Sequence, residues 1–366
     1  MKHVIQSALG WVILGAHLLL YQTAFPLIVG SNSVLSREAH VTFPAADGNN
    51  EIRGFAAMEN GFALENSTTT CLFNDFFPVS GEIVLNSGTL TLSRDLVLSN
   101  VTTWTSLGNV TGNSYNIYLS NGLSSLGSAA LEGNFSFDTV SLSLNSNITL
   151  HSSILFQGSC TLNGRGNILD LSDSGKIIIG DSGSLLIKDV TLQGISDGKI
   201  YCADSLGTIT FEDVIWIQDS NYSFTQGKFE VIENFLIKGP TTIFAYQSDQ
   251  QSSIGAYSMI KFDSGMTFSY DPPTASNDLL AFVNSTAVMH LEDTTLHSTT
   301  TGLHLTKGTL EVNGDCFISS DATVEGEGIM IGDGVLAVND VDIKYFAESS
   351  LKVVSGYLVY NNIDPA

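Results

Sequence analysis

Positive charge is scarce in this sequence. Its 366 residues include 14 Lys+Arg against 37 Asp+Glu, which gives a formal net charge of −23. Proteins that bind nucleic acids need clusters of basic side chains to displace counterions from phosphates. The sequence has no such cluster, so its composition excludes a nucleic-acid-binding function.

Cysteine and proline are also rare, at 4 and 7 residues. The spacings of Cys71, Cys160, Cys202 and Cys316 match no zinc or redox motif. We interpret these cysteines as buried small hydrophobic residues, with disulfides as the alternative. Hydrophobic residues make up 43% of the chain, which excludes a disordered acidic protein. A chain rich in Gly, Ser, Thr and Asn but poor in Lys is typical of a secreted all-β protein.

Residues 1–30 differ from the rest of the chain. Lys2 and His3 are followed by an apolar stretch that reaches Gly30 without any Asp, Glu, Lys or Arg. This pattern predicts a secretory signal peptide, or alternatively an uncleaved signal-anchor, which would then be the protein's only membrane contact. Either interpretation predicts that the remainder is secreted or lies on the cell surface.

A short repeat runs through the chain after residue 81. The segments 183–192, 207–216, 227–236, 287–296 and 334–343 share the pattern G-x-Φ-x-Φ-x-[DE]-x-x-Φ, in which Φ is apolar and Ala287 replaces the first Gly in one copy. Looser copies begin at Gly88, Gly133 and Gly308. Two apolar residues separated by one position face the same side of a short strand. The polar residue marks a turn, and the last apolar residue begins another strand with the same interior. Start-to-start distances are 24 residues (183 to 207), 20 residues (207 to 227) and 26 residues (308 to 334). We interpret the gap of 60 between residues 227 and 287 as three coils of 20.

Repeats of this length that contain only strands and turns predict a solenoid. Helical periodicity and the leucine-rich consensus are both absent. We therefore expect an all-β, single-stranded parallel β-helix of about 12 coils over residues 81–366. Residues 31–80 do not repeat and contain many Phe residues, so we expect them to form an N-terminal cap that covers the open end of the solenoid.

The segments 160–171, 175–179 and 183–192 resemble the coils of right-handed parallel β-helix proteins. The pattern is similar to that of the pectin-lyase-like superfamily and its bacterial surface and adhesin relatives, over roughly residues 81–360. This resemblance implies a fold far more than an activity.

Enzymes of that superfamily cleave polysaccharides, so their chemistry is the first to look for. The resemblance implies paired aspartates in the hydrolases, and a basic residue beside calcium-binding aspartates in the lyases. The chain has no Asp-Asp pair and only four Arg residues. Among these, Arg165 lies in a predicted turn near Asp170 and Asp173, which makes these three residues the candidates for a catalytic site.

The acidic turn positions of the repeat are Asp189, Asp213, Glu233, Asp293 and Asp340. If successive coils superpose, Asp189, Asp213 and Glu233 would lie about 5 Å apart and form a candidate Ca²⁺ site. The alternative, which we favour, is that the five carboxylates are structural and cap the backbone of their own turns. His290, His297 and His304 recur every seven residues, a spacing that does not place them on one face of a strand. We therefore expect no metal and no cofactor.

These observations lead to two functional hypotheses. The first is an exported, non-enzymatic β-helix with a surface structural or adhesive role, which binds a glycan or a host or cell-surface protein along the solenoid. The second is a carbohydrate-active β-helix enzyme, either a polysaccharide lyase or a glycoside hydrolase. A cluster of carboxylates with a base in one groove would favour the second.

Overall fold

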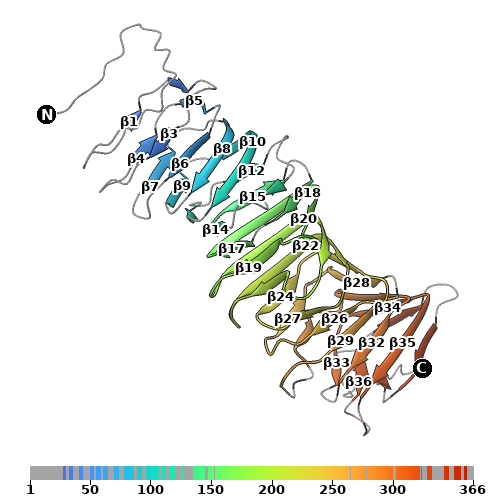
Figure 1. Cartoon of the computed structure of the whole chain (residues 1–366). Coiled ribbons are helices and arrows are strands. Elements are labelled where there is room, and N and C mark those ends of the chain that lie inside the picture. Colours follow the sequence, from blue (N-terminus) through green and yellow to red (C-terminus); the bar gives the residue numbers. More distant parts are fainter. Residues whose placement is uncertain are drawn as a thin grey trace, which may run out of the picture.

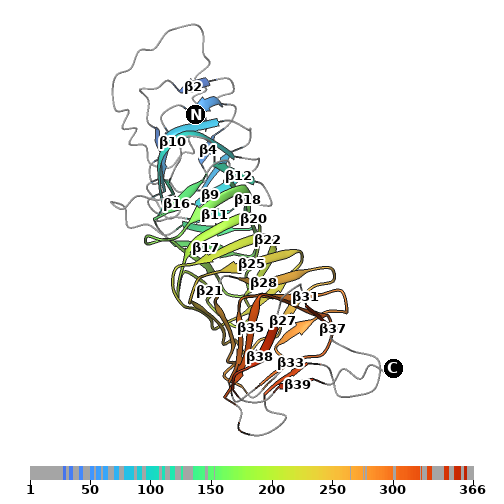
Figure 2. The same cartoon turned by 90° about the vertical axis from the view of Figure 1, so that its right-hand side faces the viewer.

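The chain folds into a parallel β-solenoid in which strands of successive coils stack along one axis (Figures 1 and 2). The computed structural model describes residues 135–321 except 145–146, 152, 264, 275, 277 and 300–301. Outside that range it describes separate strands from residue 28 to 126 and short segments from residue 323 to 360. The part that the structure describes consists of strands and turns, and it contains no helix that could cross a membrane.

Each coil has three faces, and most strands pair in parallel with the equivalent strand of the next coil. Face 1 begins the coil and its strands are β15 (Ser141–Leu144), the first halves of β18 (Ser159–Asp170), β20 (Ser184–Ile195) and β22 (Thr208–Gln218), then β24 (Lys228–Val231), β27 (Ser252–Ile254) and β30 (Leu280–Phe282).

Face 2 follows after a bend. Its strands are β16 (Ile148–Leu150), the second halves of β18, β20 and β22, then β25 (Asn234–Lys238), β28 (Met259–Asp263), β31 (Val288–Glu292), β34 (Thr309–Asn313) and β37 (Asp342–Tyr345).

Face 3 closes the coil. Its strands are β14 (Phe135–Asp138), β17 (Ser153–Gln157), β19 (Lys176–Ile179), β21 (Ile200–Cys202), β23 (Tyr222–Phe224), β26 (Ile243–Tyr246), β29 (Thr267–Tyr270), β32 (Thr295–Ser298), β35 (Asp315–Ser320) and β38 (Ser350–Val353). A further parallel ladder consists of β33 (Leu303–Leu305), β36 (Ile329–Ile331) and β39 (Leu358–Tyr360).

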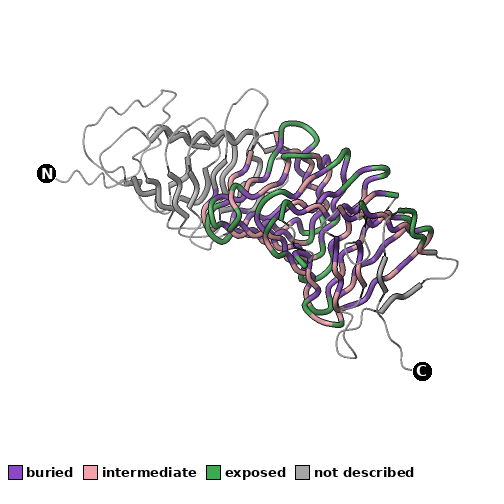
Figure 3. Tube along the Cα trace, turned by 90° about the horizontal axis from the view of Figure 1, so that it is seen from below, coloured by how far each residue is buried: buried purple, intermediate pink, exposed green. Residues whose placement is uncertain are grey.

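Three edges join the faces. We call the turns between faces 1 and 2 the first edge (residues 164–166, 189, 213, 232–233, 255–258 and 283–287). The second edge joins faces 2 and 3 (171–175, 196–199, 219–221, 239–242, 265–266, 293–294), and the third joins face 3 to the next coil (180–183, 203–207, 225–227, 247–251). Figure 3 shows that exposed residues gather at these turns, whereas buried and half-buried residues alternate along the strands.

The interior is filled by the apolar positions of the repeat. Leu185 and Ile187 of β20 stack on Ile209 and Phe211 of β22, and all four side chains are buried, as the repeat predicts. An aromatic column continues from there, with Trp216 buried and other rings in contact. Its closest ring pairs are Phe211–Phe235 with centroids 3.9 Å apart, Phe262–Phe268 at 4.5 Å and Trp216–Tyr222 at 4.9 Å. Aromatic contacts of this kind add to the stabilisation that area burial supplies.

Cys160, Cys202 and Cys316 are free and buried, which confirms their interpretation as small hydrophobic residues. Burial raises the pKa of the Cys202 thiol to about 12. The side chain of Cys71 lies outside the described residues.

The spacing of the coils differs from one expectation. Glu230 of β24 pairs with Ser253 on the next coil, and Ser253 pairs with Ala281 on the one after, so face 1 steps by 23 and 28 residues here rather than by 20. The gap from residue 227 to 287 therefore holds two coils and part of a third, and the expectation of three coils of 20 is wrong. Longer turns on the third edge take up the additional residues.

The described coils make about eight turns of solenoid. Strands also occur before residue 135 and pair in parallel with one another: β1 (Ile28–Val29), β2 (Ser33–Leu35), β3 (Val41–Phe43), β4 (Asn50–Ile52), β5 (Phe55–Met58), β6 (Gly61–Leu64), β7 (Thr70–Phe73), β8 (Pro78–Leu85), β9 (Thr89–Leu92), β10 (Leu96–Ser106), β11 (Asn109–Thr111), β12 (Asn116–Leu119) and β13 (Ser125–Leu126). The expected 12 coils and the N-terminal cap over residues 31–80 are not confirmed. The predicted signal segment lies almost entirely outside the described residues.

Candidate functional site

The first edge carries the acidic position of the repeat. Asp189 and Asp213 occupy the bends of β20 and β22 with φ of 48° and 54°. Aspartate adopts this left-handed region more readily than most residues because its short side chain can bond locally. Since Lys188 pairs with Glu212 and Val190 with Val214, the two aspartates lie opposite one another on adjacent coils.

Glu233 lies on the same edge but is offset by one residue. Val214 pairs with Phe235, so Asn234 rather than Glu233 takes the place opposite Asp213. Nδ2 of Asn234 donates a hydrogen bond to Asp213 Oδ1 at 2.8 Å, and this bond lowers the pKa of Asp213. A hydrogen bond to Asp213 and the charge of that carboxylate raise the pKa of Glu233. Among the described residues, no group of three His, Cys, Asp or Glu side chains could hold a metal ion.

The three residues proposed for catalysis fall on two edges. Arg165 is on the first edge, with φ of 52° and its N–H donated to Asn163 Oδ1 at 3.0 Å. Asp170 ends the second half of β18, so about four residues of extended strand separate it from Arg165. Asp173 follows on the second edge. The two aspartates therefore lie near one another, and Arg165 lies at the opposite end of that face.

Asp170 and Asp173 have partners on the second edge. Asp170 Oδ1 accepts the N–H of Ser172 at 2.9 Å. Partial burial raises the pKa of Asp170, but the hydrogen bonds of Ser172 and Gln193 outweigh this effect and leave it lowered. Asp173 Oδ2 is 2.6 Å from Nδ1 of His151, and its backbone carbonyl accepts Nζ of Lys199.

Asp293 does not share the position of Asp189 and Asp213. It follows β31 on face 2, so it lies on the second edge, with φ of 48°. Its Oδ1 accepts the N–H of Asp315 from the next coil at 2.9 Å. The sequence pattern therefore recurs at two different corners of the solenoid. Asp340 lies outside the described residues.

The three histidines lie on three different ladders. His290 belongs to face 2, His297 to face 3 and His304 to β33. The seven-residue spacing thus separates them, as expected. His290 is buried, and neighbouring carboxylates cover its ring.

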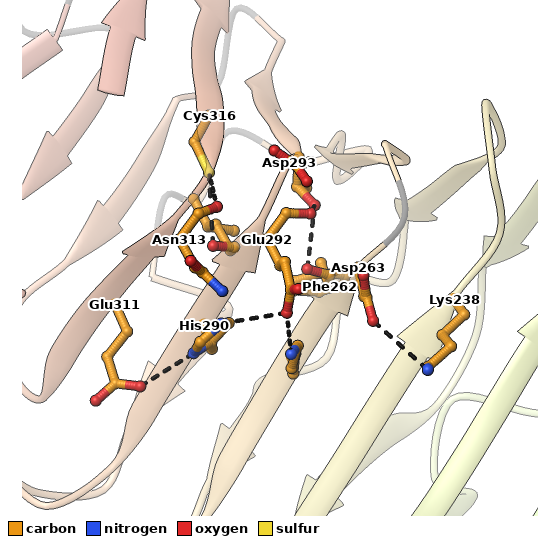
Figure 4. Close-up of polar contacts among 12 residues, drawn as sticks. Lys238, Phe262, Asp263, His290, Glu292, Asp293, Glu311, Asn313 and Cys316 are labelled. Carbon is orange, nitrogen blue, oxygen red and sulfur yellow. Dashed lines mark hydrogen bonds and ion pairs between the residues drawn. The ribbon is translucent and has the colours of Figure 1, made fainter. Parts of the chain in front are cut away.

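Face 2 carries a cluster of paired charges, which sequence reasoning missed (Figure 4). Lys261, His290 and Glu311 lie in one outward row on β28, β31 and β34. His290 Nδ1 is 3.0 Å from Glu311 Oε2, and its Nε2 is 3.8 Å from Glu292 Oε2. Lys261 Nζ also contacts Glu292, and Lys238 Nζ is 3.6 Å from Asp263 in the adjoining row. We call these six residues the face 2 charge cluster: Lys238, Lys261, Asp263, His290, Glu292 and Glu311.

Chemically, this cluster is a partly buried network in which most charges already have an opposite partner. Lys261 and Glu292 are 31 residues apart in sequence, and no local motif links them. Only the length of the coil between β28 and β31 places them side by side. In the sequence, Lys261 and Glu292 alternate with apolar residues. This alternation indicates that both side chains point outward, but it does not indicate which residue of the next coil each one contacts.

Apolar side chains are exposed on the first edge. Ile232, Tyr257 and Val283 follow the face 1 strands of three successive coils and are 42%, 86% and 53% exposed. Tyr257 has φ of 59°, which is uncommon for a bulky residue. We call these three residues the edge ridge. Sequence reasoning missed it, although a tyrosine in the turn after Gly255 and Ala256 interrupts the strand pattern.

A shallow polar hollow of about 540 Å³ lies across three turns of the second edge. Its side chains tie the turns together: Asp197 Oδ1 accepts the N–H of Ser223 at 2.6 Å, and Asn221 Oδ1 accepts that of Ile243 at 3.0 Å. The hollow is lined by Ser196, Asp197, Asp219, Ser220, Asn221, Pro240, Thr241 and Thr242.

Comparison with known proteins gives no family. No protein-family model, no curated protein and no solved structure matches the chain. Its function is therefore argued from the solenoid and its surface.

Proposed function

We propose that this chain is an exported, non-enzymatic β-solenoid with a surface structural and adhesive role. It binds a partner, a glycan or a protein, along the outside of the solenoid. Its coil pattern is similar to that of right-handed parallel β-helix proteins of the pectin-lyase-like superfamily and its bacterial surface and adhesin relatives. The N-terminal apolar segment supports export.

The register of the coils is the observation that carries this proposal. Outward side chains of successive strands align in rows, as Lys261, His290 and Glu311 do on face 2. Repetition of this kind produces an extended surface on which many weak contacts act together. The edge ridge adds exposed apolar side chains to that surface, where a partner can contact them.

The test is an assay of the purified chain on a panel of acidic and neutral polysaccharides, together with binding to a glycan array and to immobilised cell-surface proteins. We expect binding without turnover. Turnover that disappears in Glu292→Gln or Glu311→Gln would instead establish the enzyme, because these carboxylates flank His290, a possible proton-transfer group. Lys238→Gln is the matched control, since it alters the same cluster away from that histidine.

A further inference from the structure

The edge ridge comes from the first-edge turns of three successive coils. Val231, Ile254 and Phe282 pair in register on face 1, and the chain turns outward directly after each of them. Adjacent coils are about 4.8 Å apart, so the ridge spans about 10 Å along the solenoid. Ile232 and Val283 follow their strands directly, and Tyr257 lies in the turn of the coil between them, three residues after Ile254.

The turn that carries Tyr257 is held by both neighbouring coils. The N–H of Tyr257 donates to Thr286 Oγ1 at 2.8 Å, and that hydroxyl donates to Asn284 Oδ1 at 2.7 Å. On the other side, the N–H of Gly255 donates to the carbonyl of Val231 at 2.7 Å. The backbone of the turn is therefore fixed while the tyrosine ring projects into solvent.

The fold does not require an aromatic residue at this position. Turns on the other two edges have the same left-handed backbone at Ser182 and Thr241, with φ of 55° and 62°. Small polar residues satisfy that conformation there, whereas a bulky residue is uncommon in it. Since Tyr257 is 86% exposed, its side chain contributes little to packing within the chain. Sparsely populated conformations that bring no packing benefit concentrate at binding sites.

The edge leading to the ridge is acidic. Asp189 and Asp213 are exposed on the two preceding coils, and Glu233 is exposed next to Ile232 on the first coil of the ridge. Among the described residues, no lysine or arginine forms an ion pair with any of these three, although Lys188 and Lys228 pair with carboxylates on face 1 nearby. Asp213 and Glu233 also lie close together, since a hydrogen bond to Asp213 and the charge of that carboxylate raise the pKa of Glu233.

We propose that the edge ridge and its acidic approach bind a basic polypeptide. An aromatic or aliphatic side chain of the partner packs on Tyr257 between Ile232 and Val283, and a lysine or arginine lies against Asp213 and Glu233. This inference rests on the proposed binding function and names its partner class. A second copy of the chain is a poorer fit, since its net charge of −23 opposes self-association. A glycan is also a poorer fit, because Ile232 and Val283 offer its hydroxyl groups no hydrogen bonds.

The test uses a displayed library of random 12-residue peptides, selected against the wild-type chain and against Tyr257→Ser. Ser182 shows that serine is compatible with this backbone, so the variant retains its fold, which its melting temperature verifies. We expect enrichment of peptides that carry Lys or Arg beside an aromatic or aliphatic residue. Their affinity should fall at least tenfold in Tyr257→Ser and several-fold in Asp213→Asn combined with Glu233→Gln. It should also weaken from 50 to 500 mM salt.

Leu206→Ser is the matched control. Leu206 is 65% exposed in a turn of the third edge, so this variant removes a comparable apolar surface away from the ridge. It should leave peptide affinity unchanged. Failure to enrich peptides, enrichment without a basic excess, or equal affinity for Tyr257→Ser would overturn the inference. Glycan-array binding that depends on Tyr257 would overturn the partner class while leaving the proposed binding function intact; turnover on polysaccharides would overturn that function itself.

Discussion

Two glycines with nearly the same backbone conformation give a direct test of how the coils pack. Gly194 and Gly166 have φ of 74° and 76°. A Cβ atom built on Gly166 meets nothing within 4 Å, whereas one built on Gly194 lies 2.2 Å from the backbone nitrogen of Ser172 on the preceding coil. Replacing each glycine with alanine imposes the same backbone penalty at both positions, but only Gly194→Ala also forces two coils apart.

The magnitudes follow from these two terms. A left-handed conformation costs an L-residue about 1–2 kcal/mol, partly offset because alanine restricts the unfolded chain. We expect Gly166→Ala to destabilise the protein by about 1 kcal/mol. Overpacking against backbone, which cannot rotate away, adds about 1–3 kcal/mol. We therefore expect Gly194→Ala to cost about 2–4 kcal/mol.

Urea unfolding followed by far-UV circular dichroism measures both variants on the same chain. The comparison uses the difference between the two free energies of unfolding, so errors of extrapolation common to both cancel. Equal costs for the two substitutions would refute the reasoning, since they would mean that Gly194 does not lie against Ser172. A larger cost for Gly166→Ala would refute it as well.

Three further predictions follow from the interior and the ridge. Burial raises the pKa of Tyr246 from about 10 to about 12. Because the tyrosine of the unfolded chain ionises first, its stabilising contribution is complete below pH 10 and is lost as the pH rises towards 12. The free energy of unfolding in urea should therefore fall by about 1.4 kcal/mol from this residue by pH 11, and that of a Tyr246→Phe variant should fall by less. Burial also raises the pKa values of Cys160, Cys202 and Cys316. These three thiols should therefore not react with a disulfide reagent at pH 8 until denaturant is added. Rapid modification of any of them in the native chain would contradict their burial in the core. Finally, Tyr257→Asn should raise the stability by about 0.5–1 kcal/mol, since asparagine suits φ of 59°; an unchanged or lower melting temperature would show that the tyrosine ring packs within the chain.

Much of the fold was predictable because the alternation of apolar residues is local. Residues such as Leu185, Ile187, Ile209 and Phe211 are inward in the sequence pattern and buried in the structure. The acidic turn position was similarly predictable, and Asp189 and Asp213 occupy bends with a left-handed backbone.

The candidate sites were less predictable because they depend on the length of each coil. The template placed Asp293 with Asp189, yet Asp293 turns a different corner of the solenoid. The contact between Lys261 and Glu292 could not be predicted either, because it also depends on the length of the coil. An alternating pattern specifies which way a side chain points, but a change of a few residues in one turn changes its neighbour on the next coil.

By itself, the sequence determined that short strands with a common apolar interior stack in parallel, because no single coil can bury its own apolar row. It also determined the scarcity of positive charge, and thus the excess of acidic groups outside. Only the tertiary structure decided which of those groups meet. Stacking brings Asp213 to Glu233 and Asn234, pairs Lys261 with Glu292, and leaves Tyr257 projecting from the first edge. The physical reason is that side-chain neighbours on a solenoid come from adjacent coils, whose register is set by turns of variable length.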